Sequence, residues 1–136
     1  MSASTFPTLA RIYLLGVLLS ILPGSQAQVR LVETGGQITH EGQSVTLTCQ
    51  ASGFNFKDYA MSWHWSSTGS AKELVASISK DTGSYIEYRS RIKGRASIKR
   101  DNVAKTVSLT LNRLQKEDSG TYYCARLTLL EPRQRP

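Results

Sequence analysis

Short runs in which apolar and polar residues alternate recur along most of the chain, and they constrain the fold more than any other feature. Alternation with a period of two places one face of an extended strand against a core. The runs contain Val29 and Leu31, then Val45, Leu47 and Cys49, then Ala96 and Ile98, and finally Val107, Leu109 and Leu111. Turn-forming pairs such as Glu41-Gly42 and Thr82-Gly83 separate them at intervals of about ten residues. With only one helical turn expected, at residues 114–119, the pattern predicts an all-β sandwich.

The N-terminal segment does not fit that pattern. Residues 12–22 form an apolar run that follows a single arginine and precedes a proline. The run is too short to cross about 30 Å of hydrocarbon, and the small residues Ser25 and Ala27 suit a cleavage site. We therefore expect residues 1–27 to be a secretory signal peptide, with a buried helix or a membrane anchor as the alternative. No later stretch is apolar enough to span a membrane.

Secretion determines how the two cysteines, Cys49 and Cys124, are interpreted. The secretory pathway is oxidising, so we expect them to be paired rather than to remain free thiols. Closing so long a loop would stabilise the fold by about 4.5 kcal/mol if the cross-link acts by restricting the unfolded chain. The two histidines, His40 and His64, are far apart in the sequence, so no metal site and no cofactor are expected.

Catalytic patterns are absent from the sequence. It contains no G-x-S-x-G motif, no glycine-rich phosphate loop, and no nucleophile placed with a base and an orienting acid. We therefore do not expect an enzyme.

The chain is basic, with a formal net charge of +7. Five of its basic residues lie in residues 91–100, where we expect Arg91, Lys93 and Arg95 to share one side of an extended segment. Without interleaved aromatic residues that could stack on bases, this run predicts a solvated strand face rather than a specific nucleic-acid site. Weak, salt-sensitive binding to polyanions is the alternative.

The spacing of a few large residues points to a known family. Trp63 lies between Cys49 and the second cysteine, Tyr122 stands two residues before that cysteine, and residues 117–126 read EDSGTYYCAR. A Cys, Trp, Cys series with a tyrosine corner is typical of immunoglobulin domains. Over residues 28–126 the sequence resembles an immunoglobulin heavy-chain variable domain.

The resemblance implies a V-type Greek-key β-sandwich with Trp63 and Tyr122 in its core, and strand alternation from Trp63 turns Trp65 toward the same core. Trp65 stands where the family usually has arginine. The resemblance further implies that Arg95 pairs with Asp118 at the base of the sandwich, and losing one partner of such a pair would cost about 3 to 5 kcal/mol. Two solvated charges are the alternative.

The resemblance implies antigen binding by loops at one end of the sandwich. The first loop would be residues 53–61 and the second residues 78–87, while the third would follow the second cysteine. Soluble turns with no binding role are the alternative, with Lys57 and Asp58 paired to each other. The residues we expect to face the antigen are Asn55, Lys57, Asp58, Tyr59, Lys80, Asp81, Thr82, Tyr85 and Arg126.

The face that pairs with a light chain in this family is altered here. The matching positions hold His64, Ser66, Lys72 and Leu74, and charged residues are depleted from interface cores. We expect weak or differently packed light-chain association, as in heavy chains that act as single domains. If His64 is buried at this face, protonation near pH 6.5 should weaken pairing.

The end of the chain departs from the family. Residues 127–136 read LTLLEPRQRP in place of the W-G-x-G that opens the final strand, so that strand is expected to be missing or replaced. Prolines at positions 132 and 136 oppose a strand. This tail resembles that of an unjoined germline V segment, and Glu131 is a distant candidate partner for Arg126.

These observations together predict a non-catalytic domain that binds antigen as the variable region of an immunoglobulin heavy chain in adaptive immunity. It would be secreted, or exposed on the cell surface within an immunoglobulin complex, with antigen and a light chain as partners. A stand-alone immunoglobulin-like module that binds a fixed protein partner is one alternative. A non-productive segment that does not fold alone is another.

Overall fold

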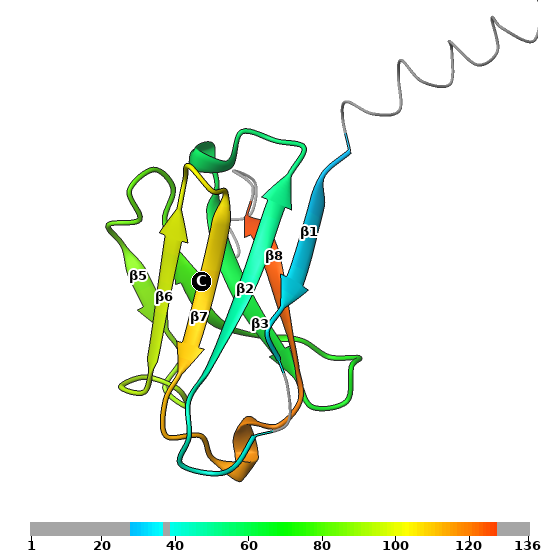
Figure 1. The fold of residues 1–136 in the computed structure, drawn as a ribbon, viewed down its shortest axis with the longest axis vertical. Coiled ribbons are helices and arrows are strands. Elements are labelled where there is room, and N and C mark those ends of the chain that lie inside the picture. The colour runs from blue at the N-terminus through cyan, green and yellow to red at the C-terminus, as the bar shows by residue number, and fades with distance from the viewer. Residues whose placement is uncertain (1–27, 37–38, 128–136) are drawn as a thin grey trace, which may run out of the picture.

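The computed structural model describes residues 28–36 and 39–127, which form two antiparallel four-stranded sheets packed face to face (Figure 1). The first sheet has the order β1-β2-β7-β6, with bounds Arg30–Thr34, Val45–Ser52, Thr106–Leu111 and Ala96–Asp101. The second sheet has the order β5-β4-β3-β8, with bounds Ile86–Tyr88, Glu73–Ile78, Ala60–Ser66 and Thr121–Leu127. The predicted all-β, V-type sandwich is confirmed.

The alternating runs of the sequence all belong to the first sheet. In β7, Val107, Leu109 and Leu111 are buried and the residues between them are half-buried. The run in β1 is less regular, because Leu31 is half-buried while Val29 precedes the strand and is 40% exposed. One face of this sheet therefore packs on the core, and the other is polar, as the period of two predicts.

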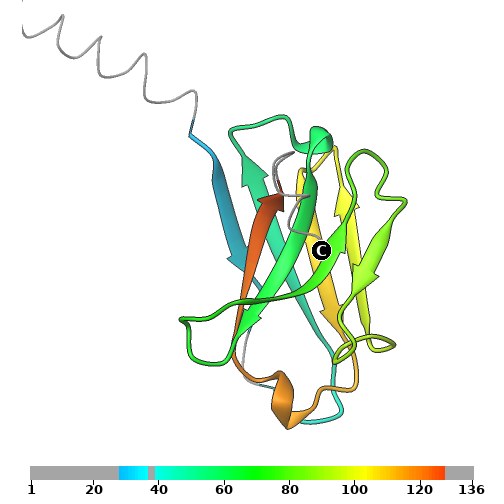
Figure 2. The ribbon, with the colours of Figure 1, turned by 180° about the vertical axis from the view of Figure 1, so that it is seen from behind.

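The second sheet lies behind the first in Figure 1 and faces the reader in Figure 2. Its strands alternate less clearly, because the pairing of β3 with β4 shifts register between Trp63 and His64. The shift leaves Val75 and Ala76 as consecutive buried residues in β4. Ser62, on β3, is also fully buried.

A disulfide between Cys49 of β2 and Cys124 of β8 joins the two sheets. Trp63 is fully buried in the same core. The other buried apolar residues come from both sheets and from their connections: Leu47, Ala51, Phe56, Met61, Val75, Ala76, Ile78, Ile92, Ile98, Val107, Leu109 and Leu111.

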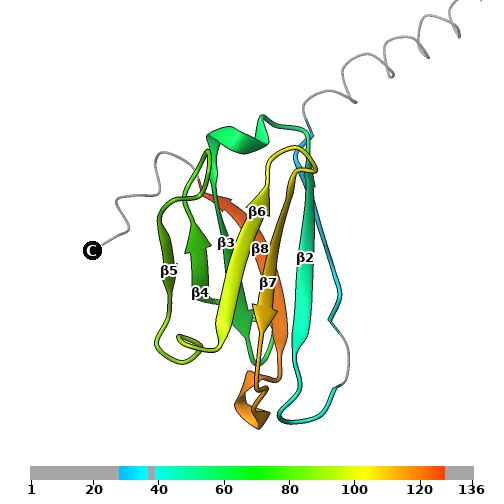
Figure 3. The same cartoon turned by 60° about the vertical axis from the view of Figure 1, so that its left-hand side comes forward.

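The connections separate into two groups at opposite ends of the sandwich (Figures 1 and 3). One end carries the β2–β3 connection with the short 3-10 helix η1, Phe56–Asp58, together with the β4–β5 and β6–β7 connections. The opposite end carries a second 3-10 helix, η2, Lys116–Asp118, within the single helical turn that the sequence predicted.

The basic run does not form one extended segment. Residues 90–95 fold into turns, in which the Arg95 amide donates to the Ile92 carbonyl oxygen at 3.0 Å. Because Ile92 is fully buried and fixes this turn to the core, Arg95 is buried, Arg91 is half-buried and Lys93 is exposed. The expectation that these three side chains lie on one side of a strand is therefore wrong.

Several sequence expectations lie outside the described residues: the signal peptide at residues 1–27, the tail from residue 128 to 136, and Glu131. Within residues 28–36 and 39–127 no strand follows β8, which ends at Leu127 and lies at the edge of its sheet. No helix in these two ranges is long and apolar enough to cross a membrane.

Candidate functional site

The β2–β3 connection, called loop 1 and comprising residues 53–59, is fixed by its aromatic residues. Phe56 in η1 is 1% exposed, and Phe54 packs against the core at its edge. The side-chain amide of Asn55 donates to an Asp58 carboxylate oxygen at 2.8 Å, so the Asp58 side chain is bonded to Asn55 rather than to Lys57. Lys57 and Asp58 are exposed. The predicted end of this loop at residue 61 is too late, because β3 already begins at residue 60.

The β4–β5 connection, called loop 2 and comprising residues 79–85, is shorter than predicted because residues 86 and 87 belong to β5. Its turn needs Gly83, since φ is +73° there and a Cβ would lie 2.7 Å from the Ile78 side chain. Lys80, Asp81 and Thr82 are exposed before it.

Tyr85 is the most prominent side chain of loop 2, with 62% of its surface exposed. Its hydroxyl donates to a Glu87 carboxylate oxygen at 2.5 Å. This hydrogen bond and the charge of Glu87 raise the pKa of Tyr85 above its ordinary value. The hydroxyl is therefore engaged with Glu87, while the ring is presented to solvent.

Arg100 of β6 joins loops 1 and 2. Its guanidinium donates to the carbonyl oxygens of Phe56 at 2.9 Å, Tyr59 at 2.9 Å and Ser79 at 2.6 Å. It also lies 4.6 Å from the centroid of the Phe56 ring. Burial lowers the pKa of Arg100, while the charge of Asp81 acts in the opposite direction. The sequence pattern gives no sign of this role of Arg100, because the basic run predicts a solvated strand face.

A second link runs through Asp81, which has a left-handed backbone with φ of +60°. Its amide donates to the Lys57 carbonyl oxygen at 2.8 Å, and its own carbonyl oxygen accepts from the Asn102 side chain at 2.7 Å. Asn102 lies in the β6–β7 connection, next to Val103, whose surface is 94% exposed. Loops 1 and 2 and this third connection form one hydrogen-bonded surface, called the loop surface below.

Arg126, near the end of β8, contacts loop 1. Its guanidinium carbon lies 4.4 Å from the ring centroid of Tyr59 and 4.8 Å from that of Phe54. The two rings pack edge to face, with centroids 5.4 Å apart. Each distance is within the range of a cation–π interaction.

The outer face of the second sheet is the face that the resemblance assigns to pairing. His64 is half-buried opposite Leu74 of β4 and Tyr123 of β8, and its Nε2 lies 2.9 Å from the Ser62 hydroxyl. The Lys72 ammonium lies over the Tyr123 ring, 4.1 Å from the centroid. Burial and, to a smaller extent, Lys72 lower the pKa of His64.

Ser66 does not belong to that face as an accessible residue. It is 1% exposed, and its hydroxyl accepts a hydrogen bond from the Gly69 amide at 2.7 Å. The expectation for Ser66 is therefore wrong, because the β3–β4 turn folds over its side chain. Strand alternation alone does not reveal such a turn.

The base of the sandwich contains the ion pair implied by the resemblance. Arg95 donates to both carboxylate oxygens of Asp118, at 2.9 and 3.0 Å, and both side chains are buried. The hydrogen bond to Asp118 raises the pKa of Arg95. Burial alone would raise the pKa of Asp118, but hydrogen bonds from Arg95 and the Gln115 amide, with the charge of Arg95, hold it below its ordinary value.

Tyr122 makes the tyrosine corner at this base. Its hydroxyl donates to the Asp118 carbonyl oxygen at 2.7 Å, and burial together with the Asp118 charge raises the pKa of Tyr122 to about 12. Trp65 is half-buried, and its Nε1 donates to the Ser119 carbonyl oxygen at 3.1 Å. Gly120 is required beside it, because a Cβ there would lie 2.6 Å from Trp65 Nε1.

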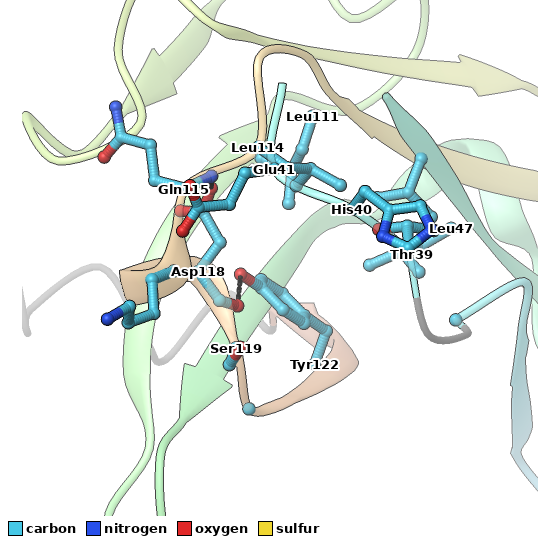
Figure 4. Close-up of a pocket in the computed structure, with 14 residues that line it drawn as sticks. Thr39, His40, Glu41, Leu47, Leu111, Leu114, Gln115, Asp118, Ser119 and Tyr122 are labelled. Atoms are coloured by element: carbon cyan, nitrogen blue, oxygen red, sulfur yellow. Dashed lines mark hydrogen bonds between the residues drawn. The ribbon is translucent and has the colours of Figure 1, made fainter. Parts of the chain in front are cut away.

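A cavity of about 400 Å³ opens beside η2, at the end of the sandwich away from the loop surface (Figure 4). Leu47, Leu111 and Leu114 supply apolar lining, and Tyr122 and Asp118 lie at one side of it. His40 and Glu41 also line it, but both are exposed. In the part of the chain that the structure describes, no three metal-ligating side chains come together.

The sequence of residues 35–134 matches the family model of the immunoglobulin V-set domain, so the chain belongs to the immunoglobulin V-set family. Domains of this family are binding modules, and the chain is not an enzyme.

Two solved structures, each described as a marsupial T cell receptor, are similar to it. One is 71% identical with a TM-score of 0.72, over 76% of this chain and 31% of that one. The other is 67% identical with a TM-score of 0.72, over 74% of this chain and 31% of that one. The chain thus spans about a third of the solved chains it matches.

Proposed function

We propose that this chain is the antigen-recognising variable domain of a receptor of adaptive immunity and that it acts outside the cell. The observation that carries the proposal is the loop surface, in which Arg100 and Asp81 join three connections into one rigid unit. A rigid surface loses little conformational entropy on binding, and its exposed side chains remain free for contacts. The disulfide and the expected signal peptide support an oxidising, extracellular location.

The contact residues of this proposal are Lys57, Asp58, Lys80, Thr82 and Tyr85, all exposed on loops 1 and 2. Tyr85 would serve as the main aromatic contact, since its ring buries a large area with few rotatable bonds. Asn55, Tyr59 and Asp81, also expected at the antigen, act chiefly by fixing the loops, because each is engaged with neighbouring groups.

The receptor type has two candidates. The similarity at 71% identity to a marsupial T cell receptor favours a T cell receptor chain. The heavy-chain resemblance of residues 117–126 favours an immunoglobulin heavy chain. Long-read sequencing of transcripts that encode residues 28–127 tests this choice, because the constant region joined to them identifies the receptor. A transcript without a constant region would instead support a stand-alone module.

A paired variable domain, such as a light chain, is the second proposed partner. The face it would cover carries Lys72 over Tyr123, beside half-buried His64. Pairing would require the ammonium to leave the ring or to be buried, and both are unfavourable. We therefore propose weak pairing.

Selection of ligands tests antigen recognition directly. A random peptide library would be panned on the full chain, with counter-selection on a Lys57→Ala, Tyr85→Ala variant. We expect peptides whose binding weakens at least about tenfold in the single variant Tyr85→Ala, as for an aromatic contact at an interface centre. Lys99→Ala, an exposed cation on the outer face of β6, is the matched control and should leave binding unchanged. Binding that depends on Lys99 but not on Tyr85 would contradict the proposal.

A further inference from the structure

We propose that Arg126 recognises a carboxylate of the ligand, with Phe54 and Tyr59 holding its guanidinium beside loop 1. The inference rests on the proposed function, because it names the chemistry of the ligand that the loop surface would take. It starts from a cation whose side-chain contacts in the described part of the chain are with two aromatic rings rather than with an acidic residue.

The donor groups of Arg126 have no acceptor in the described part of the chain. Among residues 28–36 and 39–127, no carboxylate lies within ion-pair distance of its guanidinium, and no oxygen accepts a hydrogen bond from it. Its nitrogens are also not among the buried, unpartnered polar atoms of those residues. A guanidinium offers five N–H donors in one plane, and the half-buried Arg126 side chain keeps part of its surface in contact with solvent.

The nearby acidic side chains are already engaged elsewhere. Asp58 of loop 1 accepts from Asn55 at 2.8 Å. A carboxylate oxygen of Glu33, on β1, accepts a hydrogen bond from the backbone amide of Cys124 at 2.9 Å. Cys124 lies on β8, the strand that carries Arg126. Neither carboxylate is an ion-pair partner of Arg126, so an acceptor from outside the described residues can take that place.

The charges of loops 1 and 2 suit a singly charged ligand group. A single guanidinium matches the two oxygens of one carboxylate in a bidentate pair. The exposed ammonium groups of Lys57 and Lys80 are balanced by the exposed carboxylates of Asp58 and Asp81, so the loops add no net positive charge to attract a doubly charged phosphate. The net charge of +7 also favours the approach of acidic partners.

Two sources could supply the carboxylate: an acidic side chain of the ligand, or Glu131 of this chain. The test separates them with peptides selected from the library on the full chain. Each selected peptide that contains Asp or Glu is paired with a version carrying the matching amide. Both versions are measured against the wild-type chain and against Arg126→Gln, Arg126→Lys and Glu131→Gln. Lys99→Gln removes an exposed cation on the outer face of β6, outside loops 1 and 2, and serves as the control.

We expect the amide version to bind about 10- to 100-fold more weakly to the wild-type chain, the range for a hydrogen bond to a charged group. In Arg126→Gln the difference should fall below about twofold, and Arg126→Lys should restore only part of it, because lysine lacks the planar fork. Lys99→Gln should keep the full difference. Thermal unfolding of each variant checks that the fold is intact.

Each other outcome overturns the inference in a recognisable way. Selected peptides without a carboxylate, or an equal amide effect in Arg126→Gln, would overturn it while leaving the proposed function standing. A carboxylate effect that appears only in Glu131→Gln would assign Arg126 to the chain's own tail. A selection that yields no peptide dependent on loops 1 and 2 would overturn the proposed function and this inference together.

Discussion

The guanidinium of Arg91 lies over the indole of Trp65, 4.0 Å from the ring centroid. Trp65 occupies a position where the resemblance implies an arginine, so here the turn at residues 90–95 brings a guanidinium to the tryptophan instead. The Nε and Nη2 atoms of Arg91 are buried without a hydrogen-bond acceptor among the described residues, while Nη1 lies 4.0 Å from an Asp118 carboxylate oxygen. The two residues therefore act as a pair.

Replacing either member of this pair should remove a partly desolvated cation–π interaction. We expect Arg91→Ala to lower the free energy of unfolding by about 1 to 2 kcal/mol. Trp65→Leu also loses the bond to the Ser119 carbonyl oxygen, so a double-mutant cycle by urea unfolding is needed to isolate the pair. Additive effects of the two substitutions would show that the contact does not contribute.

Breaking the buried ion pair at the base should cost more. We expect Asp118→Ala to lower the free energy of unfolding by about 3 to 5 kcal/mol, because Arg95 would remain buried and unpaired. The double variant Arg95→Met, Asp118→Leu should lose less, since the buried charge of Arg95 is removed as well and only the partly exposed Arg91, 4.0 Å from Asp118, loses an ion-pair partner. Equal losses in the two variants would contradict this account.

The same pair predicts acid sensitivity. The pKa of Asp118 is lower in the folded chain than in the unfolded one, so the pair stabilises the fold above about pH 4, the ordinary pKa of aspartate. This stabilisation is lost as the pH falls further. Urea unfolding as a function of pH should show the decline in the wild type and a smaller one in the double variant.

His64 predicts a second, milder pH dependence. Because burial and Lys72 lower its pKa, the unfolded chain takes up a proton first as the pH falls below about 6.5, and stability declines from there. His64→Gln should flatten the stability profile between about pH 6.5 and 5. Because the pKa of His64 is lowered, we expect its protonation to weaken pairing only at a pH below 6.5. Size-exclusion chromatography between about pH 6.5 and 5 can follow this loss of pairing.

Lys72 should limit association through the face it covers. We expect Lys72→Leu to strengthen self-association or pairing with an added light-chain variable domain, because it removes a cation and exposes the Tyr123 ring. Sedimentation velocity measures this, with Lys99→Leu as a control on the other sheet. Nanomolar pairing by the wild-type chain would contradict the proposal of a weak interface.

Among residues 28–36 and 39–127, β8 pairs with β3 alone, and this sheet edge and the cavity beside η2 predict a response to an added strand. Extending the chain with a segment that begins W-G-x-G should pair that edge and cover apolar lining such as Leu111. Non-reducing thermal unfolding should then shift upward by about 4 to 8 °C for each kcal/mol gained. Identical melting of the two forms would favour a stand-alone module.

The sequence predicted one sheet much better than the other. The first sheet has one polar face, so residues such as Val107 and Leu109 produce a clear alternation. The second sheet has buried groups on both faces, Ser62 among them, and the register shift after Trp63 interrupts its period. Periodicity alone does not identify strands of that kind, and the family resemblance was needed to place them.

The sequence predicted which residues of the loop surface are exposed, but not the hydrogen bonds that join the loops. Loop residues such as Lys57 and Tyr85 could be recognised as exposed from turn chemistry, and the structure exposes them. The role of Arg100 could not be predicted, because it depends on carbonyl groups more than twenty residues away that only the fold brings together. A charged residue next to a turn gives no local sign of such long-range bonds.

The bonds that Arg100 makes to loops 1 and 2 all end on main-chain oxygens, those of Phe56, Tyr59 and Ser79. The link from Asp81 to Lys57 likewise joins only main-chain atoms. Every amino acid supplies the same carbonyl oxygen, so these attachments do not depend on which side chains the loops carry. The domain can therefore accumulate sequence diversity at positions such as Lys57 and Lys80 while the geometry that displays them is inherited unchanged.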